Sequence, residues 1–145
     1  MCVCARVSVC VFSLSYPLQD LTELFGTEWA KEYLLPSVLS IHNHESYLQR
    51  LTAVHACGMM STKLDRAVVI NDIIPIVLEM AADDVANIRF NVAQTLSGIT
   101  LVAGVEVYRT QVQPVLTLLS DDPDRDVVFF ANKTCEQLEQ AFALS

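Results

Sequence analysis

The 145-residue sequence has few of the residues that make turns. It contains only four glycines and five prolines. An all-β sandwich or barrel needs a turn signal about every 8–12 residues, so the scarcity of turn formers disfavours that class and favours helices. Hydrophobic residues make up 52% of the chain and charged residues 18%. This balance excludes a disordered chain and is sufficient for one domain with a sizeable core.

Positive charge is also scarce. Nine Lys and Arg residues stand against 17 Asp and Glu residues, giving a formal net charge of −8, and no Lys/Arg cluster offsets it. Nucleic-acid backbones and anionic membrane surfaces would be repelled by such a chain. We therefore expect no nucleic-acid partner and no membrane partner.

The motifs of common enzyme classes are missing. The sequence has no glycine-rich phosphate loop and no G-x-S-x-G motif. His55 and Cys57 stand two residues apart on a predicted helix, so they do not share a face and make a poor nucleophile pair. His42 and His44 flank a turn beside Glu45, but a structural zinc site needs about four ligands and no other Cys or His is nearby. We expect no catalytic residue, no metal and no cofactor, and hence not an enzyme.

The cysteines do not form a disulfide framework. Their number is odd, and they lie at positions 2, 4, 10, 57 and 135. Cys57 and Cys135 fall on apolar helical faces, which indicates buried thiols in a reducing compartment. The predicted location is therefore the cytoplasm, with the nucleus as a further site.

Residues 1–16, MCVCARVSVCVFSLSY, do not match the rest of the chain. We favour the interpretation that they are an unmatched start outside the fold, as in a truncated or mis-started gene product. The alternative is a secretory signal, with Arg6 before the apolar stretch Val7–Leu14. That stretch is short and lacks a clean cleavage site. If it were a true signal, the protein would be secreted or membrane-directed.

A period of 39 residues organises the remainder. Pro36, Pro75 and Pro114 lie at equal intervals in three segments that align without gaps: LLPSVLSI, IIPIVLEM and VQPVLTLL. Apolar positions around each proline share one helical face, and a second apolar face follows in each unit. Each unit is therefore predicted to be two amphipathic helices. Because the apolar pattern runs through each proline, we expect a kinked first helix.

The turns between the paired helices are predicted to line up along one edge. They read SIHNHES, AADDVA and SDDPDR, at 40–46, 81–86 and 120–125. Their Ser, Asp and Asn side chains can cap the second helices, at about 1 kcal/mol each. Aligned turns on one edge of a stack of repeats are also where such proteins often bind their partners.

The spacing of Pro75, Asp83 and Arg89 resembles the HEAT-repeat signature, in which acidic and basic residues of adjacent units form a ladder. His44 replaces the acid in the first unit, and Val128 replaces the arginine in the third, so we expect an incomplete ladder. The fold class that follows is all-α: an α-solenoid, or superhelix, of antiparallel helix pairs of the HEAT/armadillo type. The expected order is a helix tail at 17–26 and three repeats at 27–62, 63–103 and 104–145.

Within the HEAT-repeat family, the chain resembles the scaffolding A subunits of protein phosphatase 2A. The segments that carry this resemblance are DVANIRFNVAQTL at 84–96, FGTEWA at 25–30 and YLQRLT at 47–52. It covers about residues 18–145 and implies the last three repeats of a longer scaffold. The first helix pair would then expose apolar surface, since three repeats are close to the minimum for a stable stack. We expect self-association through that uncapped N-terminal end.

The resemblance implies a non-catalytic role in assembly. In the scaffolds of this family, repeats at this end bind the phosphatase catalytic subunit through the turns and the starts of the second helices, whereas the surface for the regulatory subunit would be absent here. By position, the predicted partner-binding residues are Asn43, His44, Tyr47, Arg50, Asp83, Asn87, Arg89, Asp122 and Asp126. A HEAT adaptor for another protein, such as a transport receptor, is the alternative.

Overall fold

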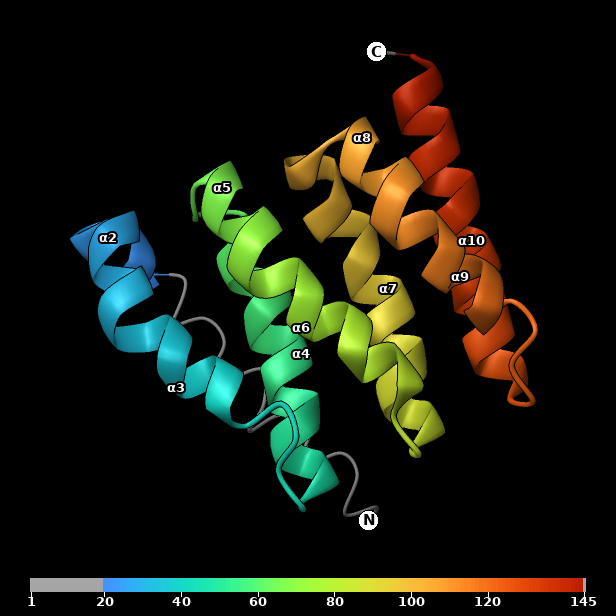
Figure 1. Ribbon diagram of the computed structural model, residues 1–145, viewed down its shortest axis with the longest axis horizontal. Coiled ribbons are helices and arrows are strands. Elements are labelled where there is room, and N and C mark those ends of the chain that lie inside the picture. Colours follow the sequence, from blue (N-terminus) through green and yellow to red (C-terminus); the bar gives the residue numbers. More distant parts are fainter. Residues whose placement is uncertain (1–19, 145) are drawn as a thin grey trace.

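The computed structural model describes residues 20–144, and every regular element in that range is helical. Residues 20–25 form a short helix that leads into three stacked helix pairs (Figure 1). The first helix of each pair is continuous but composed of segments. In the first pair these are α2 (Thr27–Trp29), η1 (Ala30–Leu34) and α3 (Leu35–Ser40), and in the third pair they are α8 (Val105–Val107), η4 (Tyr108–Val112) and α9 (Gln113–Leu119). In the second pair they are α5 (Arg66–Val68), η2 (Val69–Ile73) and α6 (Ile74–Glu79), followed by the short η3 (Met80–Ala82). The second helices are α4 (Tyr47–Ser61), α7 (Ala86–Ala103) and α10 (Arg125–Ala143).

The pairs form two layers, with the first helices in one and the second helices in the other (Figure 1). Within the second layer, α7 packs against both α4 and α10. The core lies between the layers and takes apolar side chains from all three pairs. In α7, Ile88, Val92, Leu96 and Ile99 are fully buried, each stabilising the stack by about 1.5–3 kcal/mol. The predicted all-α solenoid of about three repeats is confirmed.

Each first helix continues through its proline, as the apolar pattern predicted. A π-helical turn precedes the proline in every pair, at η1, η2 and η4. In the first pair, the N–H of Leu35 donates to the carbonyl of Ala30, five residues back, and Pro36 follows. The widened turn is the local irregularity at which a residue without an N–H enters a helix.

At the opposite edge from the three turns, the second helix of one pair leads into the next pair. Gly104 follows α7 with a φ of 93°, a conformation that L side chains rarely adopt. A Cβ at this position would lie 2.8 Å from Nη2 of Arg66, whose Nε donates to the carbonyl of Ala103. Glycine therefore allows the chain to turn while Arg66 joins the start of the first helix of the second pair to the end of its second helix.

Two further sequence predictions concern the surface and the thiols. Leu24, Phe25 and Tyr33 are exposed in and beside the first helix, which supports the expected apolar surface there; self-association stays a prediction. Cys57 is buried and Cys135 half-buried, and both are free thiols. Burial raises the pKa of the Cys57 thiol to about 12.

Residues 1–16 lie outside the described range, so neither interpretation of them is tested. Within residues 20–144, no helix is both long enough and apolar enough to span a bilayer.

Candidate functional site

The turns between paired helices lie side by side along one edge of the stack (Figure 1), which we call the loop edge: residues 40–46, 80–85 and 120–124. Each turn is closed by the same bond. The side chain eight residues after the proline accepts a hydrogen bond from the backbone N–H two residues later. The three bonds are Ser46 N to His44 Nδ1 at 3.0 Å, Val85 N to Asp83 Oδ1 at 2.9 Å, and Asp124 N to Asp122 Oδ1 at 2.8 Å. His44 therefore reproduces the turn that aspartate makes in the other two units.

Side-chain capping of the second helices occurs in only one of these turns. Asp124 accepts hydrogen bonds from the N–H groups of Asp126 and Val127 at the start of α10. The residues before α4 and α7, Ser46 and Val85, make no side-chain cap bond. The capping prediction is therefore confirmed for the third turn and wrong for the other two. Ser46 makes no side-chain bond to α4, and Val85 has no side-chain acceptor.

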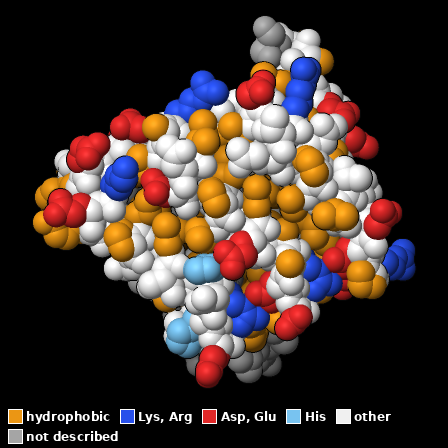
Figure 2. All heavy atoms as spheres, in the orientation of Figure 1, with side chains coloured by type: hydrophobic (Ala, Val, Ile, Leu, Met, Phe, Trp, Pro, Cys, Tyr) orange, Lys and Arg blue, Asp and Glu red, His pale blue; other side chains and the backbone are white. Residues whose placement is uncertain are grey.

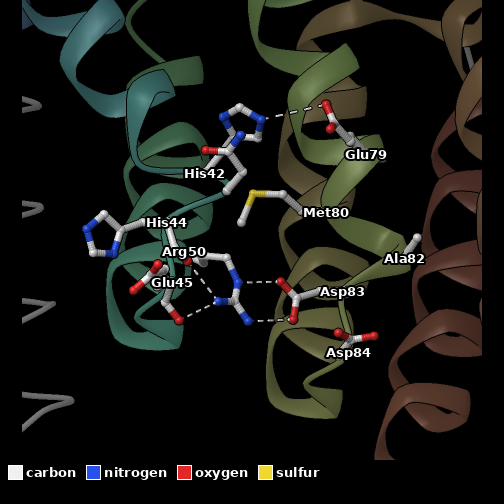
Figure 3. Close-up of a pocket in the computed structure, with 10 residues that line it drawn as sticks. His42, His44, Glu45, Arg50, Glu79, Met80, Ala82, Asp83 and Asp84 are labelled. Atoms are coloured by element: carbon white, nitrogen blue, oxygen red, sulfur yellow. Dashed lines mark hydrogen bonds and ion pairs between the residues drawn. The ribbon is translucent and has the colours of Figure 1, made fainter.

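Paired arginine and aspartate side chains link successive turns. Arg50 Nε donates to Asp83 Oδ2 at 2.6 Å and its Nη2 to Asp83 Oδ1 at 3.0 Å (Figure 3). Arg89 and Asp122 make the same two bonds at 2.7 and 2.9 Å. Such bidentate pairs have a fixed geometry, since the guanidinium and the carboxylate are both planar. Each link therefore sets the spacing and the orientation of two neighbouring turns.

The same arginines also bind the turn of their own unit. Arg50 Nη1 donates to the carbonyls of His44 and Glu45 at 2.8 and 3.1 Å. Arg89 Nη1 donates to the carbonyls of Asp83 and Asp84 at 2.7 and 3.1 Å. One guanidinium thus satisfies four acceptors, and the loop edge becomes a hydrogen-bonded unit rather than three independent turns.

The expected ladder between adjacent units is present, and the expectation that it is incomplete is wrong for the links between the three described units. The arginine of each unit pairs with the acid of the next unit. The position of His44 would pair with an arginine of a preceding unit, and the position of Val128 would pair with an acid of a following unit. Residues 20–144 contain neither of these units. Both departures from the HEAT pattern therefore occur at the ends of the described stack, and both internal links are present.

The ladder is mostly removed from solvent, which shifts the pKa values of its members. The Asp83 and Asp122 side chains are each 8% exposed, and those of Arg50 and Arg89 are 16% and 14% exposed. Burial acts to raise the pKa of Asp83, but hydrogen bonds from Arg50 and from the backbone of Val85, together with the arginine charges, lower it overall. For Asp122 the hydrogen bond from Arg89 is the largest cause of a lowered pKa. Both aspartates are therefore held ionised.

A lowered carboxyl pKa predicts acid sensitivity. The stabilisation by Asp122 is complete above its ordinary pKa of 3.8 and is lost as the pH falls through the lower folded-state value. We expect the Asp122→Asn variant to be less stable than wild type by a constant amount between about pH 8 and 5, and this difference to shrink below about pH 4. Urea unfolding of both proteins across this range, followed by circular dichroism, measures it. A difference that does not change with pH would contradict an ionised Asp122.

The nine predicted partner-binding residues divide into two groups. Four are the ladder residues, Arg50, Asp83, Arg89 and Asp122, whose side chains are already engaged within the stack. The other five are exposed along the loop edge or at the starts of second helices: Asn43, His44, Tyr47, Asn87 and Asp126. Contact with a partner stays a prediction for all nine, and the exposed five have side chains available for it.

Sequence reasoning missed a second contact between units. His42 Nε2 lies 3.7 Å from Glu79 Oε2, across a hollow of about 330 Å³ between the first two turns (Figure 3). The two residues stand at different positions of their units, so the repeat alignment does not bring them together. Residues 20–144 hold no group of three or more His, Cys, Asp or Glu side chains suited to a metal ion.

Comparisons with known proteins agree with this architecture. Residues 73–103 match the HEAT repeat family. The chain is 28% identical to the A-type regulatory subunit of protein phosphatase PP2A from Saccharomyces cerevisiae, over 83% of this chain and 20% of that protein. It is 50% identical to the serine/threonine-protein phosphatase PP2A 65 kDa regulatory subunit of Drosophila melanogaster, over 36% of this chain and 9% of the relative. It is 40% identical to the beta isoform of the 65 kDa A-type regulatory subunit of serine/threonine-protein phosphatase 2A from Homo sapiens, over 39% of this chain and 10% of the relative.

The chain thus spans a fifth or less of the length of these relatives. The predicted resemblance to the HEAT repeats of phosphatase A subunits is confirmed over that part. The proteins it resembles are regulatory subunits.

Proposed function

We propose that this chain is a non-catalytic scaffold that binds the catalytic subunit of a type 2A-like serine/threonine protein phosphatase through its loop edge. The observation that carries the proposal is the arginine–aspartate ladder, which aligns three turns on one edge of a stack similar to phosphatase A subunits. The location would be the cytoplasm, with the nucleus as a further site.

A preorganised edge favours binding. Loops that are already ordered lose little conformational entropy when a partner docks, so more of the contact energy appears as affinity. Tyr47 is 42% exposed at the start of α4, and an exposed tyrosine is a residue type enriched among the energetically important contacts of interfaces. Asn87 lies at the corresponding end of α7, and its Oδ1 accepts a hydrogen bond from Asn91 Nδ2 at 2.9 Å. Tyr47 and Asn87 are therefore both exposed polar residues at the starts of second helices.

The side chains with nucleophilic or acid–base potential support a non-catalytic role. The Cys57 thiol is fully buried, and its raised pKa keeps it protonated near neutral pH. Burial lowers the pKa of His55. The ladder aspartates are paired with arginines, so neither is placed to exchange a proton with a bound substrate.

Binding of the purified type 2A catalytic subunit to the full chain, measured by biolayer interferometry, tests the proposal. We expect the double variant Tyr47→Ala/Asn87→Ala to bind at least about tenfold more weakly, because it removes two exposed contacts while keeping the ladder. Arg109→Ala is the matched control, since Arg109 is exposed in the first helix of the third pair, away from the loop edge. It should bind as wild type does.

Two results would reject the proposal. Absence of binding at about 10 µM catalytic subunit, with wild-type helical content, would exclude this partner and favour an adaptor for another protein. Equal affinities for the double variant and for wild type would show that the predicted edge is not the contact surface.

A further inference from the structure

Two grooves separate neighbouring units beside the loop edge, and the same two positions of the repeat border both. In the first groove these positions hold His42, six residues after Pro36, and Glu79, four residues after Pro75. Their side chains approach across the groove to 3.7 Å (Figure 3). Its floor includes Met80. The groove has a volume of about 330 Å³, and the imidazole of His42 and the carboxylate of Glu79 meet across it.

In the second groove the same two positions hold Ala81 and Leu118. Neither side chain can form an ion pair, so these two positions make no contact like that of His42 and Glu79, and the Arg89–Asp122 pair of the ladder lines the groove instead. The volume of this groove is about 620 Å³. Leu78, Val115 and Pro123 are among the other apolar residues that line it. At these two positions a polar pair, His42 and Glu79, is therefore replaced by two apolar side chains, Ala81 and Leu118.

The second groove presents an apolar side chain where its counterparts are polar. Leu118 is 74% exposed, whereas the corresponding residues of the first two units are Ser40 and Glu79. Apolar side chains also gather over the layer of first helices in which α9 lies (Figure 2). A large exposed leucine beside an open groove is suited to contact an aliphatic group of another molecule.

The rim of this groove is acidic. Two of its acids, Asp83 and Asp122, are bound to ladder arginines. The third, Asp84, is exposed, and its carboxylate accepts no hydrogen bond within residues 20–144. Arg89 also lines the groove, but its guanidinium is bound to Asp122. The exposed carboxylate of Asp84 can therefore pair with a cation of another molecule next to the apolar floor.

We propose that the groove between the second and third units binds a short extended segment of a partner protein, with a leucine-like side chain on the floor and an adjacent lysine or arginine at Asp84. The apolar floor accounts for the aliphatic side chain, and the acidic rim accounts for the basic neighbour. This site is formed by the chain alone and does not depend on binding of a phosphatase.

Fluorescence anisotropy with defined peptides tests the proposal on the full chain. The probe is a fluorescein-labelled heptapeptide, Gly-Ser-Lys-Leu-Lys-Ser-Gly. One comparison peptide has glutamate in place of both lysines, and another has serine in place of leucine. We expect each comparison peptide to bind at least about tenfold more weakly than the probe. Binding of the probe should also weaken as salt rises from about 0.05 to 0.5 M, because its lysines pair with an exposed carboxylate.

Variants of the protein locate the site. Ala81→His/Leu118→Glu introduces the residues that bridge the first groove and should lower the affinity for the probe at least about tenfold. The single variant Leu118→Glu should have the same direction of effect, and its exposed position leaves the core intact. The matched control, His42→Ala/Glu79→Ala, changes the same positions of the first groove and should leave the affinity within about twofold of wild type.

Three results would overturn the proposal. The first is no binding of the probe at about 1 mM. The second is equal binding of the glutamate or serine peptide, which would exclude the basic or the aliphatic requirement. The third is wild-type affinity in the folded Leu118→Glu variant, or a loss in the first-groove control, either of which would place the peptide elsewhere.

Discussion

Arg89→Ala is expected to lower the free energy of unfolding by about 2–4 kcal/mol, because it removes one member of a mostly buried, bidentate ion pair. Asp122, 8% exposed, would lose its two side-chain donors. The carbonyls of Asp83 and Asp84 would lose a donor as well. Part of this cost is relieved by water, since the site lies at the edge of the stack rather than in its centre.

Thermal unfolding monitored by circular dichroism measures this effect. For a domain of this size, we expect the midpoint to fall by about 10 °C. Arg109→Ala is the control, because it removes an exposed arginine that the structure gives no ion pair among residues 20–144. A fall in midpoint of less than about 2 °C for Arg89→Ala would contradict a structural role for the ladder. Weaker partner binding without any loss of stability would instead indicate a direct contact at Arg89.

Leu96→Ala should destabilise the stack by about 3 kcal/mol, because it leaves a cavity in the central helix. Leu96 is fully buried in α7, and α7 contacts both α4 and α10. A looser α7 therefore weakens the interfaces on both of its sides. The stability of a repeat protein depends on contacts between neighbouring units, so the loss of packing in the central unit should destabilise the whole stack.

The same helix provides the control. Leu101 also belongs to α7 but is 54% exposed, so Leu101→Ala removes the same atoms without creating a buried cavity. We expect it to change the free energy of unfolding by less than about 1 kcal/mol. Urea unfolding of both variants decides the matter. Equal effects would show that α7 is not packed between its neighbours as the structure indicates.

The local patterns of the chain were sufficient to predict the fold. Three prolines spaced 39 residues apart, with apolar positions in the same register, predicted helix pairs and a stack, and the structure confirms both. This succeeds because helix formation and burial depend on spacings of three and four residues, which are visible in the sequence. The same patterns placed the turns on one edge, since antiparallel pairs of equal length bring equivalent turns together.

The contacts between turns required the tertiary structure. Sequence comparison aligns equivalent positions, but Arg50 with Asp83 and His42 with Glu79 join different positions of successive units. The offset that pairs them depends on how far each unit shifts and rotates on its neighbour, and that displacement results from side-chain packing across the whole core. Capping shows the same limit, because the sequence does not reveal which residue of a turn stands directly before the helix. In the structure this residue is Val85 for α7 and Asp124 for α10.

The sequence by itself therefore determined the helical repeat, its register and the edge where its turns gather, because these follow from local periodicity. Only the tertiary structure decided which acid each arginine binds, that the ladder is complete within the described stack, and that His42 meets Glu79 across one groove while Ala81 and Leu118 border the next. These features depend on the geometry between units, where a displacement of a few ångströms decides which side chains meet.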